Sequence, residues 1–208
     1  MPTPICKICM QPFGVDSLAS LFDKHLCVCA SCYGSFNPKW TKHKLDGTPV
    51  LALYDYDEFI KEKLFLLKGC HDYELAPIFI DRHKRLLRYI YKRCTIVPIP
   101  SWHEDDARRG YNHVEAIFAP LLLPMRRLLE KSEPYKQSDR SYSQRDQIKN
   151  VMRLQENEDI SGKDILIVDD VMTSGSSVRA ALGLLKPLKP RRIRVLVIAR
   201  TIAPETSR

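Results

Sequence analysis

The sequence predicts an α/β domain built on a mostly parallel sheet, preceded by a small cysteine-rich module. Short apolar runs near residues 50, 96, 165 and 195 alternate with helical patterns, which is typical of parallel strands covered by helices on both faces. Two Cys-x-x-Cys pairs stand close to the N-terminus. An apolar run after residue 164 leads directly into two acids and a short loop of small residues. These three features together indicate the fold class.

The composition fits a soluble globular protein of 208 residues, with 44% hydrophobic and 28% charged side chains. No apolar run approaches the roughly 18 residues that a membrane crossing needs, and no signal peptide is visible. We therefore expect a cytoplasmic protein without membrane insertion. The net charge of +8 favours an anionic partner such as DNA, RNA or a polyphosphate, although a basic surface alone explains it equally well.

The cysteine pairs predict a metal site. Cys6 with Cys9, and Cys29 with Cys32, each offer two thiolates from a tight turn, and two such turns make a tetrahedral zinc site. Four thiolates leave no open position, so we interpret the zinc as structural. Cys27 is an alternative to Cys29, and His25 and His43 are alternatives for one ligand. The predicted division is a zinc-binding module at 1–40, a polar linker at 41–47 and a main domain at 48–208.

The main domain reads in order as alternating strands and helices. We expect a strand at 49–56, a helix at 57–67 stopped by Gly69, and a second helix within 72–92 that starts near Pro77. A strand at 95–100 precedes a loop at 101–112, and a helix that Pro124 ends follows. The last strand covers 193–199. His83 falls on the apolar face of its helix, which favours a core histidine over a ligand.

Two basic stretches and one tryptophan allow two interpretations. Basic residues on the second helix form either a solvated face or a stripe that contacts DNA; they are Arg82, Lys84, Arg85, Arg88, Lys92 and Arg93. A second basic cluster surrounds the start of the last strand, at Lys186, Lys189, Arg191, Arg192 and Arg194. Trp40 either stacks on a base or packs against the main domain, and we favour packing.

Residues 165–177 carry the strongest functional signal. A strand ends in Asp169 and Asp170, and a loop of small residues opens a helix with Val178, Ala181, Leu182 and Leu185 on one face. Unpaired N–H groups at a helix start bind phosphate, hydroxyl groups add donors, and Gly175 lets the backbone approach a ligand. Two carboxylates beside such a cradle suit the cis-diol of a sugar, or a magnesium ion shared with phosphates.

This stretch resembles the signature of type I phosphoribosyltransferases, which bind phosphoribosyl pyrophosphate (PRPP). The resemblance implies a PRPP site made of Asp169, Asp170, Val171, Met172, Thr173, Ser174, Gly175, Ser176 and Ser177. The loop would hold the 5′-phosphate. Asp169 and Asp170 would be the catalytic acids, contacting the ribose hydroxyls and stabilising positive charge at the anomeric carbon. Magnesium would bridge the pyrophosphate oxygens.

Two further elements narrow the resemblance to the ComF family of competence-associated proteins. Val97-Pro98-Ile99-Pro100 is followed by Arg108, Arg109, Gly110, Tyr111 and Asn112, similar to the VPVP strand and R-G-[FY]-N loop of that family. The family also has an N-terminal CxxC…CxxC zinc module. The resemblance implies that residues 108–112 bind pyrophosphate, and that the protein handles single-stranded DNA in natural transformation, with a DNA-uptake helicase as a partner. The alternative is a metabolic phosphoribosyltransferase that transfers ribose 5-phosphate to an unidentified nitrogen acceptor.

Residues 134–150 are basic, hydroxyl-rich and poor in large apolar side chains. In the resembled enzymes a mobile loop in this region closes over the reacting centre, and an ordinary surface loop is the competing interpretation. Gln137, Asn150 and Val151 fit the outline of ComF-like proteins, but Gln147 stands where their arginine is expected.

Overall fold

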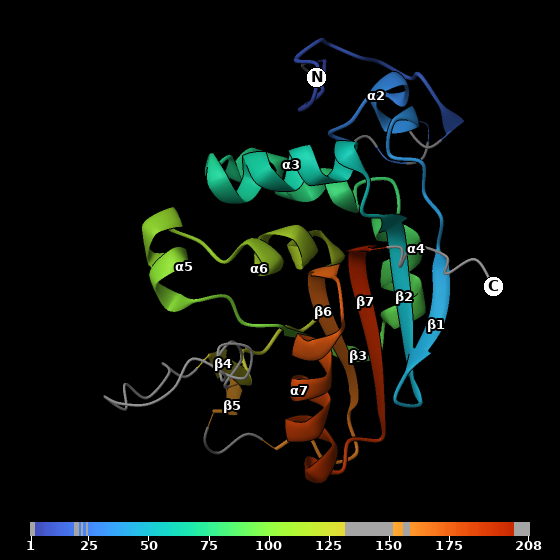
Figure 1. The fold of residues 1–208 in the computed structure, drawn as a ribbon. Helices are drawn as coiled ribbons and strands as arrows, with labels where there is room; N and C mark the ends of the chain where they lie inside the picture. Colours follow the sequence, from blue (N-terminus) through green and yellow to red (C-terminus); the bar gives the residue numbers. More distant parts are fainter. Residues whose placement is uncertain are drawn as a thin grey trace, which may run out of the picture.

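The computed structural model describes residues 3–18, 21, 23, 25–131, 152–155 and 159–201. Five strands form one sheet in the order β1-β2-β7-β6-β3 (Figure 1). The parallel strands are β2 (Thr48–Asp55), β7 (Arg192–Arg200), β6 (Asp164–Met172) and β3 (Cys94–Pro98). β1 (Thr41–Leu45) pairs antiparallel with β2. The predicted α/β class with a mostly parallel sheet is confirmed.

Side chains that alternate along β6 separate two hydrophobic clusters, one on each face of the sheet. Ile165 and Ile167 pack in the cluster that contains α7 (Ser176–Leu185). Leu166 and Val168 pack in the other cluster, which holds side chains of η1 (Tyr73–Phe79), α4 (Lys84–Tyr91) and α6 (His113–Phe118). Burial on both faces explains why the strands read as continuous apolar runs.

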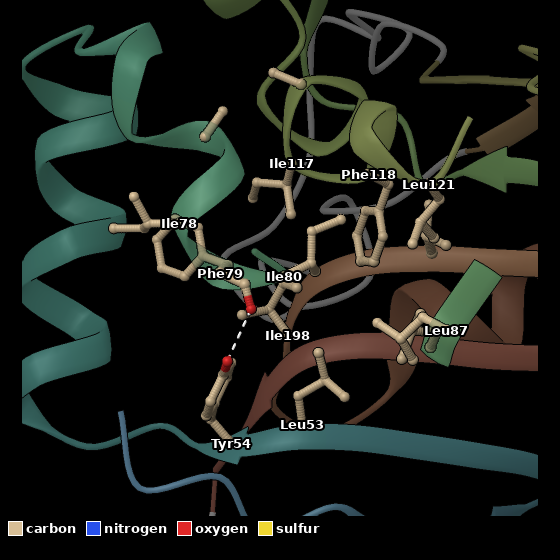
Figure 2. Packing of buried hydrophobic residues seen from close by; sticks show 14 of the residues in the cluster. Leu53, Tyr54, Ile78, Phe79, Ile80, Leu87, Ile117, Phe118, Leu121 and Ile198 are labelled. Atoms are coloured by element: carbon tan, nitrogen blue, oxygen red, sulfur yellow. Dashed lines mark hydrogen bonds between the residues drawn. The ribbon is translucent and has the colours of Figure 1, made fainter. Parts of the chain in front are cut away.

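The cluster on the α4 side is the larger core. Figure 2 shows Leu53 and Ile198, from neighbouring strands, facing Phe79, Ile117 and Phe118 of the covering helices. Tyr54 is almost fully buried, and its hydroxyl donates to the Phe79 carbonyl at 2.9 Å. Burial also raises the pKa of this phenol. The bond satisfies a polar group that would otherwise cost free energy in the core.

Two helices lie at the carboxyl ends of the strands. α3 (Glu58–Gly69) crosses above them, and α5 (His103–Arg109) lies to the left of α3 and α6 in Figure 1. The Asp57 side chain caps α3 by accepting from the Ile60 N–H at 2.9 Å. Shorter elements complete the domain: α2 (Ala30–Gly34), η2 (Ala119–Leu121), η4 (Lys186–Leu188) and a hairpin of β4 (Leu129–Lys131) with β5 (Met152–Leu154).

The structure differs from the predicted elements in three places. The segment expected as a linker forms β1, because Asp46 and Gly47 both have positive φ and make a two-residue hairpin turn into β2. The single helix expected within 72–92 is instead η1 followed by α4. The loop expected at 101–112 contains α5, so Arg108 and Arg109 lie on a helix.

The N-terminal module packs on the main domain through both apolar and polar contacts. Phe36 is 1% exposed and contacts the Phe59 ring of α3 edge-on, with 5.0 Å between centroids. Asp81 accepts hydrogen bonds from the N–H groups of Cys27 and Val28 at 2.8 and 3.2 Å. Arg82 donates to the Val28 carbonyl at 2.9 Å. The turn before α4 therefore holds the module, which accounts for the interrupted helix.

His83 and Trp40 both lie in this contact region. His83 is buried, its Nε2 lies 3.1 Å from the Tyr33 hydroxyl, and burial lowers its pKa to about 4. The Trp40 ring meets His83 edge-on at 5.0 Å. Both observations agree with a core histidine and a packing tryptophan. None of the described helices has the length and apolarity that a bilayer crossing demands.

Candidate functional site

Asp169 and Asp170 lie inside the last half of β6 and are 9% and 6% exposed. Asp169 faces the α7 side of the sheet and Asp170 the opposite side, because side chains alternate along a strand. The Asp169 Oδ1 atom accepts the Asp170 N–H at 2.9 Å. Lys68, from the last turn of α3, makes an ion pair with Asp170 Oδ2. The acids thus stand at the carboxyl edge, below α3.

His113 is the second group that faces Asp170, with Nε2 at 3.5 Å from Oδ2. Arg109 lies 2.8 Å from His113 Nδ1, and because a guanidinium can only donate, Nδ1 is the acceptor. The imidazole is therefore neutral and turns its Nε2–H toward the acid. Burial lowers the His113 pKa to about 2, and the nearby cations Lys68, Arg109 and Lys131 act in the same direction.

Burial also dominates the titration of the charged groups around the acids. It raises the pKa of Asp169 to about 7, against the attraction of Lys68 and Lys131. It lowers the pKa of Lys68 to about 8, although Asp169 stabilises the ammonium. Lys131, on β4, has a lowered pKa for the same reason. Acids and lysines with pKa values drawn together are typical of a functional site.

The loop after β6 has the geometry of an anion cradle. Gly175 stands at the N-cap of α7 with φ +76°, a left-handed conformation that glycine adopts without strain. A Cβ at Gly175 would lie 3.1 Å from the Leu45 side chain. Thr173, Ser174 and Ser176 are exposed, and Gly175 has no side chain that could cap α7. The Ser174 hydroxyl accepts from the Ser176 N–H at 3.4 Å. Among the described contacts, no side chain accepts from the N–H groups that follow in the first turn, so these are available to an anion.

Residues 108–112 mainly brace the edge of the site. Gly110 ends α5 with φ +79°. Asn112 caps α6 by accepting from the Glu115 N–H at 3.0 Å, and its amide donates to Asp106 at 2.8 Å. The Tyr111 hydroxyl donates to the Leu67 carbonyl of α3. The Arg109 side chain is 7% exposed and pairs with Asp106 at 3.3 Å, whereas that of Arg108 is 72% exposed.

Two cavities flank this region. One of about 600 Å³ lies between α3 and α5 and is lined by Tyr56, Phe65, Lys68, Arg108 and Arg109, among others. The other, of about 800 Å³, lies between the α5–α6 segment and the β4–β5 hairpin, with Ser101, Asn112, Lys131 and Arg153 in its wall. Lys68 lines the first cavity and also contacts Asp170. Lys68 therefore lies between Asp170 and this cavity.

The four predicted cysteine ligands come together. The Sγ atoms of Cys6, Cys9, Cys29 and Cys32 all lie within 4.8 Å of one another. Four sulfurs around zinc at ~2.3 Å would be about 3.8 Å apart, close to the 4.0 Å between Cys9 and Cys29. The Cys29 and Cys32 N–H groups donate to the Cys6 and Cys29 sulfurs at 3.4 Å, as they would to thiolates. The donor set fits a structural zinc ion.

Cys27 lies outside this group, and its N–H is held by Asp81. Burial, with the nearby Asp81 charge, raises the pKa of its thiol. His25 and His43 do not join the cluster within the described part of the chain. The geometry therefore agrees better with Cys29 as a metal ligand than with Cys27, His25 or His43 in its place.

The structure brings the acid pair and the 108–112 segment to one edge of the sheet, through His113 and Lys68. Sequence reasoning missed both of these residues. His113 could have been found, because it directly follows the Arg-Arg-Gly-Tyr-Asn element. Lys68 has no local signal, since it reaches Asp170 only through the packing of α3. The expectations on 134–150 and Val151 lie outside the described residues; β4 and β5, on either side of them, pair with each other.

Comparison with known proteins agrees with this geometry. A family model for the phosphoribosyl transferase domain matches residues 129–206. The competence protein ComFC of Streptococcus pneumoniae is 24% identical over 220 residues, covering 94% of this chain and 99% of the relative. The chain is therefore similar to ComFC over nearly the whole length of both proteins, and its C-terminal part is similar to the phosphoribosyl transferase domain.

The solved structures that resemble this chain are distant from it in sequence. A hypoxanthine phosphoribosyltransferase of Staphylococcus aureus is 11% identical with a TM-score of 0.39, over 65% of this chain and 71% of that one. A purine phosphoribosyltransferase of Pyrococcus horikoshii is 16% identical with a TM-score of 0.36, and the match covers 62% of this chain and 90% of that one. Phosphoribosylpyrophosphate synthetase of Mycobacterium smegmatis is 17% identical with a TM-score of 0.33. That match covers 55% of this chain and 33% of the synthetase, so the chain spans about a third of that protein.

Proposed function

We propose that this protein binds PRPP at the carboxyl edge of its sheet. The observation that carries the proposal is the start of α7, where a left-handed Gly175 opens the helix and the Ser174 hydroxyl is the side chain that meets the first N–H, that of Ser176. This loop would take the 5′-phosphate, with Thr173, Ser174, Ser176 and Ser177 adding hydroxyl donors. Asp169 and Asp170 stand one loop away at the end of the same strand and would contact the hydroxyls of the ribose.

The pyrophosphate would lie toward the cavity between α3 and α5. Arg108 is the exposed cation there, whereas Arg109 is held by Asp106 and His113 and so positions the segment. Gly110, Tyr111 and Asn112 fix the ends of α5 and α6 and support α3. Magnesium would enter with the pyrophosphate, whose oxygens it prefers. Zinc in the cysteine cluster would hold the N-terminal module together.

Titration calorimetry with PRPP and magnesium tests this proposal. The double variant Asp169→Asn, Asp170→Asn should lose more than about tenfold in affinity, or 1.4 kcal/mol, because it removes the acceptors for the ribose hydroxyls. Asp159→Asn is the matched control and should bind as the unaltered chain does, because Asp159 is exposed and precedes β6, at the opposite end of that strand from the acid pair. Equal PRPP affinity in the double variant and the control would refute the site.

Catalysis is a separate step of the proposal. If the chain is a phosphoribosyltransferase, Asp169 and Asp170 would stabilise the charge that develops at the anomeric carbon as pyrophosphate leaves. A metabolic transferase that uses a nitrogen acceptor is the alternative to a binding function. Pyrophosphate release from PRPP in the presence of candidate bases would favour the transferase, and binding without release would favour the ComFC-like function.

A second surface favours single-stranded DNA as a further ligand. An apolar cavity of about 640 Å³ lies between α4 and the β1–β2 hairpin, and Trp40, Leu86 and Ile90 contribute to its wall. Lys42, Lys44 and Arg194 line the same cavity, and no acidic side chain does. Aromatic and apolar walls beside cations suit unstacked bases and a phosphate backbone.

The basic residues of α4 contribute less than the sequence suggested. Arg82 and Lys84 turn toward the N-terminal module, and Arg88 donates to the Leu121 carbonyl at 2.8 Å. Exposed basic side chains at Arg85, Lys92 and Arg93 stay on the surface. The second basic cluster, Lys186 to Arg192, lies at the opposite end of the sheet from the acid pair.

DNA binding is tested by its salt dependence. The slope of log affinity against log salt for a single strand should fall by about 1.4 in the double variant Lys42→Ala, Lys44→Ala, since each phosphate contact contributes about 0.7. Lys61→Ala on α3 should leave the slope unchanged. No single-strand binding at low salt would exclude the DNA function. The name of the S. pneumoniae relative, competence protein ComFC, supports a role in competence. A cytoplasmic location and an uptake helicase as a partner are further parts of the proposal.

A further inference from the structure

Lys68 occupies a position at the acid pair that a divalent cation could otherwise take. Its ammonium forms an ion pair with Asp170 Oδ2, and His113 Nε2 lies 3.5 Å from the same oxygen. Among the described residues, no other hydrogen-bond donor reaches this buried atom. An unpaired buried carboxylate is costly, so the charge of Lys68 is required there.

Neighbouring contacts hold the Lys68 end of α3 in place. The Tyr111 hydroxyl donates to the carbonyl of Leu67, the residue before Lys68. At the other end of α3, the Phe59 ring packs against Phe36 of the N-terminal module. Leu64 and Leu67 are 2% and 0% exposed and fix the face that α3 turns toward the core. The packing of α3 therefore fixes the position of Lys68 next to the acids.

The same geometry does not suit a magnesium ion resident on the two acids. Magnesium requires six oxygen ligands in octahedral order and usually keeps several waters. Asp169 and Asp170 are 9% and 6% exposed, and the ammonium adjoins the oxygen of Asp170. In the described part of the chain, the group of side chains able to hold a metal ion is the cysteine cluster. With the ammonium of Lys68 in place, the acids therefore leave no open position for a resident metal ion.

We propose that Lys68 is a positioning residue that replaces a protein-bound metal ion: its ammonium neutralises the acid pair, and magnesium reaches the site only as part of a phosphate ligand. The second half of this statement rests on the proposed PRPP function, whereas the first concerns the ligand-free chain. Lys68 then supplies the positive charge that the buried Asp170 carboxylate requires. It also prevents a free divalent ion from occupying the site.

Manganese binding to the zinc-loaded, ligand-free chain tests the proposal, because Mn²⁺ accepts the same oxygen ligands as Mg²⁺ and is detected by electron paramagnetic resonance. Lys68→Met should bind Mn²⁺ at least about tenfold more tightly than the unaltered chain, a difference of 1.4 kcal/mol. Adding Asp170→Asn to Lys68→Met should remove that gain. Lys68→Arg keeps a cation and should gain no site.

Lys61→Met on the same helix is the matched control, since Lys61 is exposed and pairs only with Glu58 among the described residues. The proposal is overturned if the unaltered chain already binds Mn²⁺ at Asp170, or if Lys68→Met folds and gains no Mn²⁺ site. Thermal melts establish folding for each variant. These outcomes need no PRPP, so failure of PRPP to bind would overturn the proposed function without altering the manganese result.

Discussion

The turn that holds the N-terminal module and the edge that holds the acid pair use buried charges in different ways. In the turn, Asp81 is 3% exposed and accepts from two backbone N–H groups and from Lys84 at 3.1 Å. At the edge, Asp170 is 6% exposed, but its partners are two side chains, Lys68 and His113. The first carboxylate is enclosed by backbone donors, and the second by groups that can move.

The difference separates a structural charge from one available for binding. Backbone donors cannot leave Asp81 without unfolding the module, so its hydrogen bonds serve stability. Side-chain partners at Asp170 leave the surrounding backbone unchanged when the hydroxyl groups of a ligand join them. The exposed start of α7 has the same character, since the Ser176 N–H meets a side chain, the Ser174 hydroxyl, at 3.4 Å. Each prediction below changes one of these two regions.

Removal of zinc should have the largest effect. A structural zinc site of four thiolates contributes about 10 kcal/mol or more to folding, so a chelator should unfold the N-terminal module. Phe36 would then leave the rings of Phe59 and Tyr54. Near-ultraviolet circular dichroism and limited proteolysis within residues 3–40 would report the loss. A chelated chain with an unchanged spectrum would contradict the structural role of the cluster.

Asp81→Ala should be the next most damaging change. It leaves the N–H groups of Cys27 and Val28 without their acceptor and Lys84 without one of its partners, for a cost of about 3–5 kcal/mol. Urea unfolding at constant zinc measures it. Glu62→Ala removes an exposed ion pair and should cost less than about 1 kcal/mol. Comparable losses in the two variants would mean that the turn does not hold the module.

Gly175→Val should damage the edge locally. The left-handed φ of +76° is strained for a β-branched residue, and the new Cβ would meet the Leu45 side chain at 3.1 Å. We expect a loss of about 1–3 kcal/mol in stability and a larger proportional loss of PRPP affinity. Gly183→Ala, on the same α7 with open space around it, is the control. Unfolding curves and PRPP calorimetry on both variants would show whether stability and PRPP affinity depend on the loop at Gly175 or on α7 in general.

A further effect concerns pH. The pKa of Asp169 is raised by burial to about 7, so the folded chain keeps a proton that the unfolded chain releases near pH 4. Stability from this group therefore falls as pH rises from about 4 to 7. His113 acts oppositely: its pKa is lowered to about 2, so the unfolded chain takes up a proton below about pH 6.5 and stability rises with pH there.

Asp169→Asn removes the first of these contributions and leaves the second. The melting temperature of the variant relative to the unaltered chain should therefore be higher at pH 8 than at pH 5. Thermal melts at the two pH values check this, with Glu62→Gln as a control. An identical difference at both values would mean that Asp169 is ionised throughout the range.

The sequence predicted the sheet better than it predicted the surroundings of the site. Residues 165–177 are readable because a strand, a loop and a helix start are local patterns. β1 was missed although Asp46-Gly47 is a hairpin signal, because the polar alternation of residues 41–45 resembles a linker. Such an edge strand has one pairing partner and too few apolar side chains to be recognised from the sequence.

The remaining misses come from long-range packing. Nothing near Lys68 in the sequence marks it, since its partner is about a hundred residues away along the chain and only the placement of α3 brings them together. Arg82 and Lys84 looked like surface charges because a helical period does not show where a module will dock. Arg109 is expected at the pyrophosphate, and its internal partners Asp106 and His113 could not be inferred from the sequence.

Hydrogen exchange of the backbone amides, with and without PRPP and magnesium, tests the central claim most directly because it locates the ligand. We predict that PRPP slows exchange at residues 175–178, where the start of α7 would hold the phosphate, and that Asp169→Asn with Asp170→Asn abolishes this protection. Protection confined to other segments, or none at saturating PRPP, would contradict a PRPP site at this edge of the sheet.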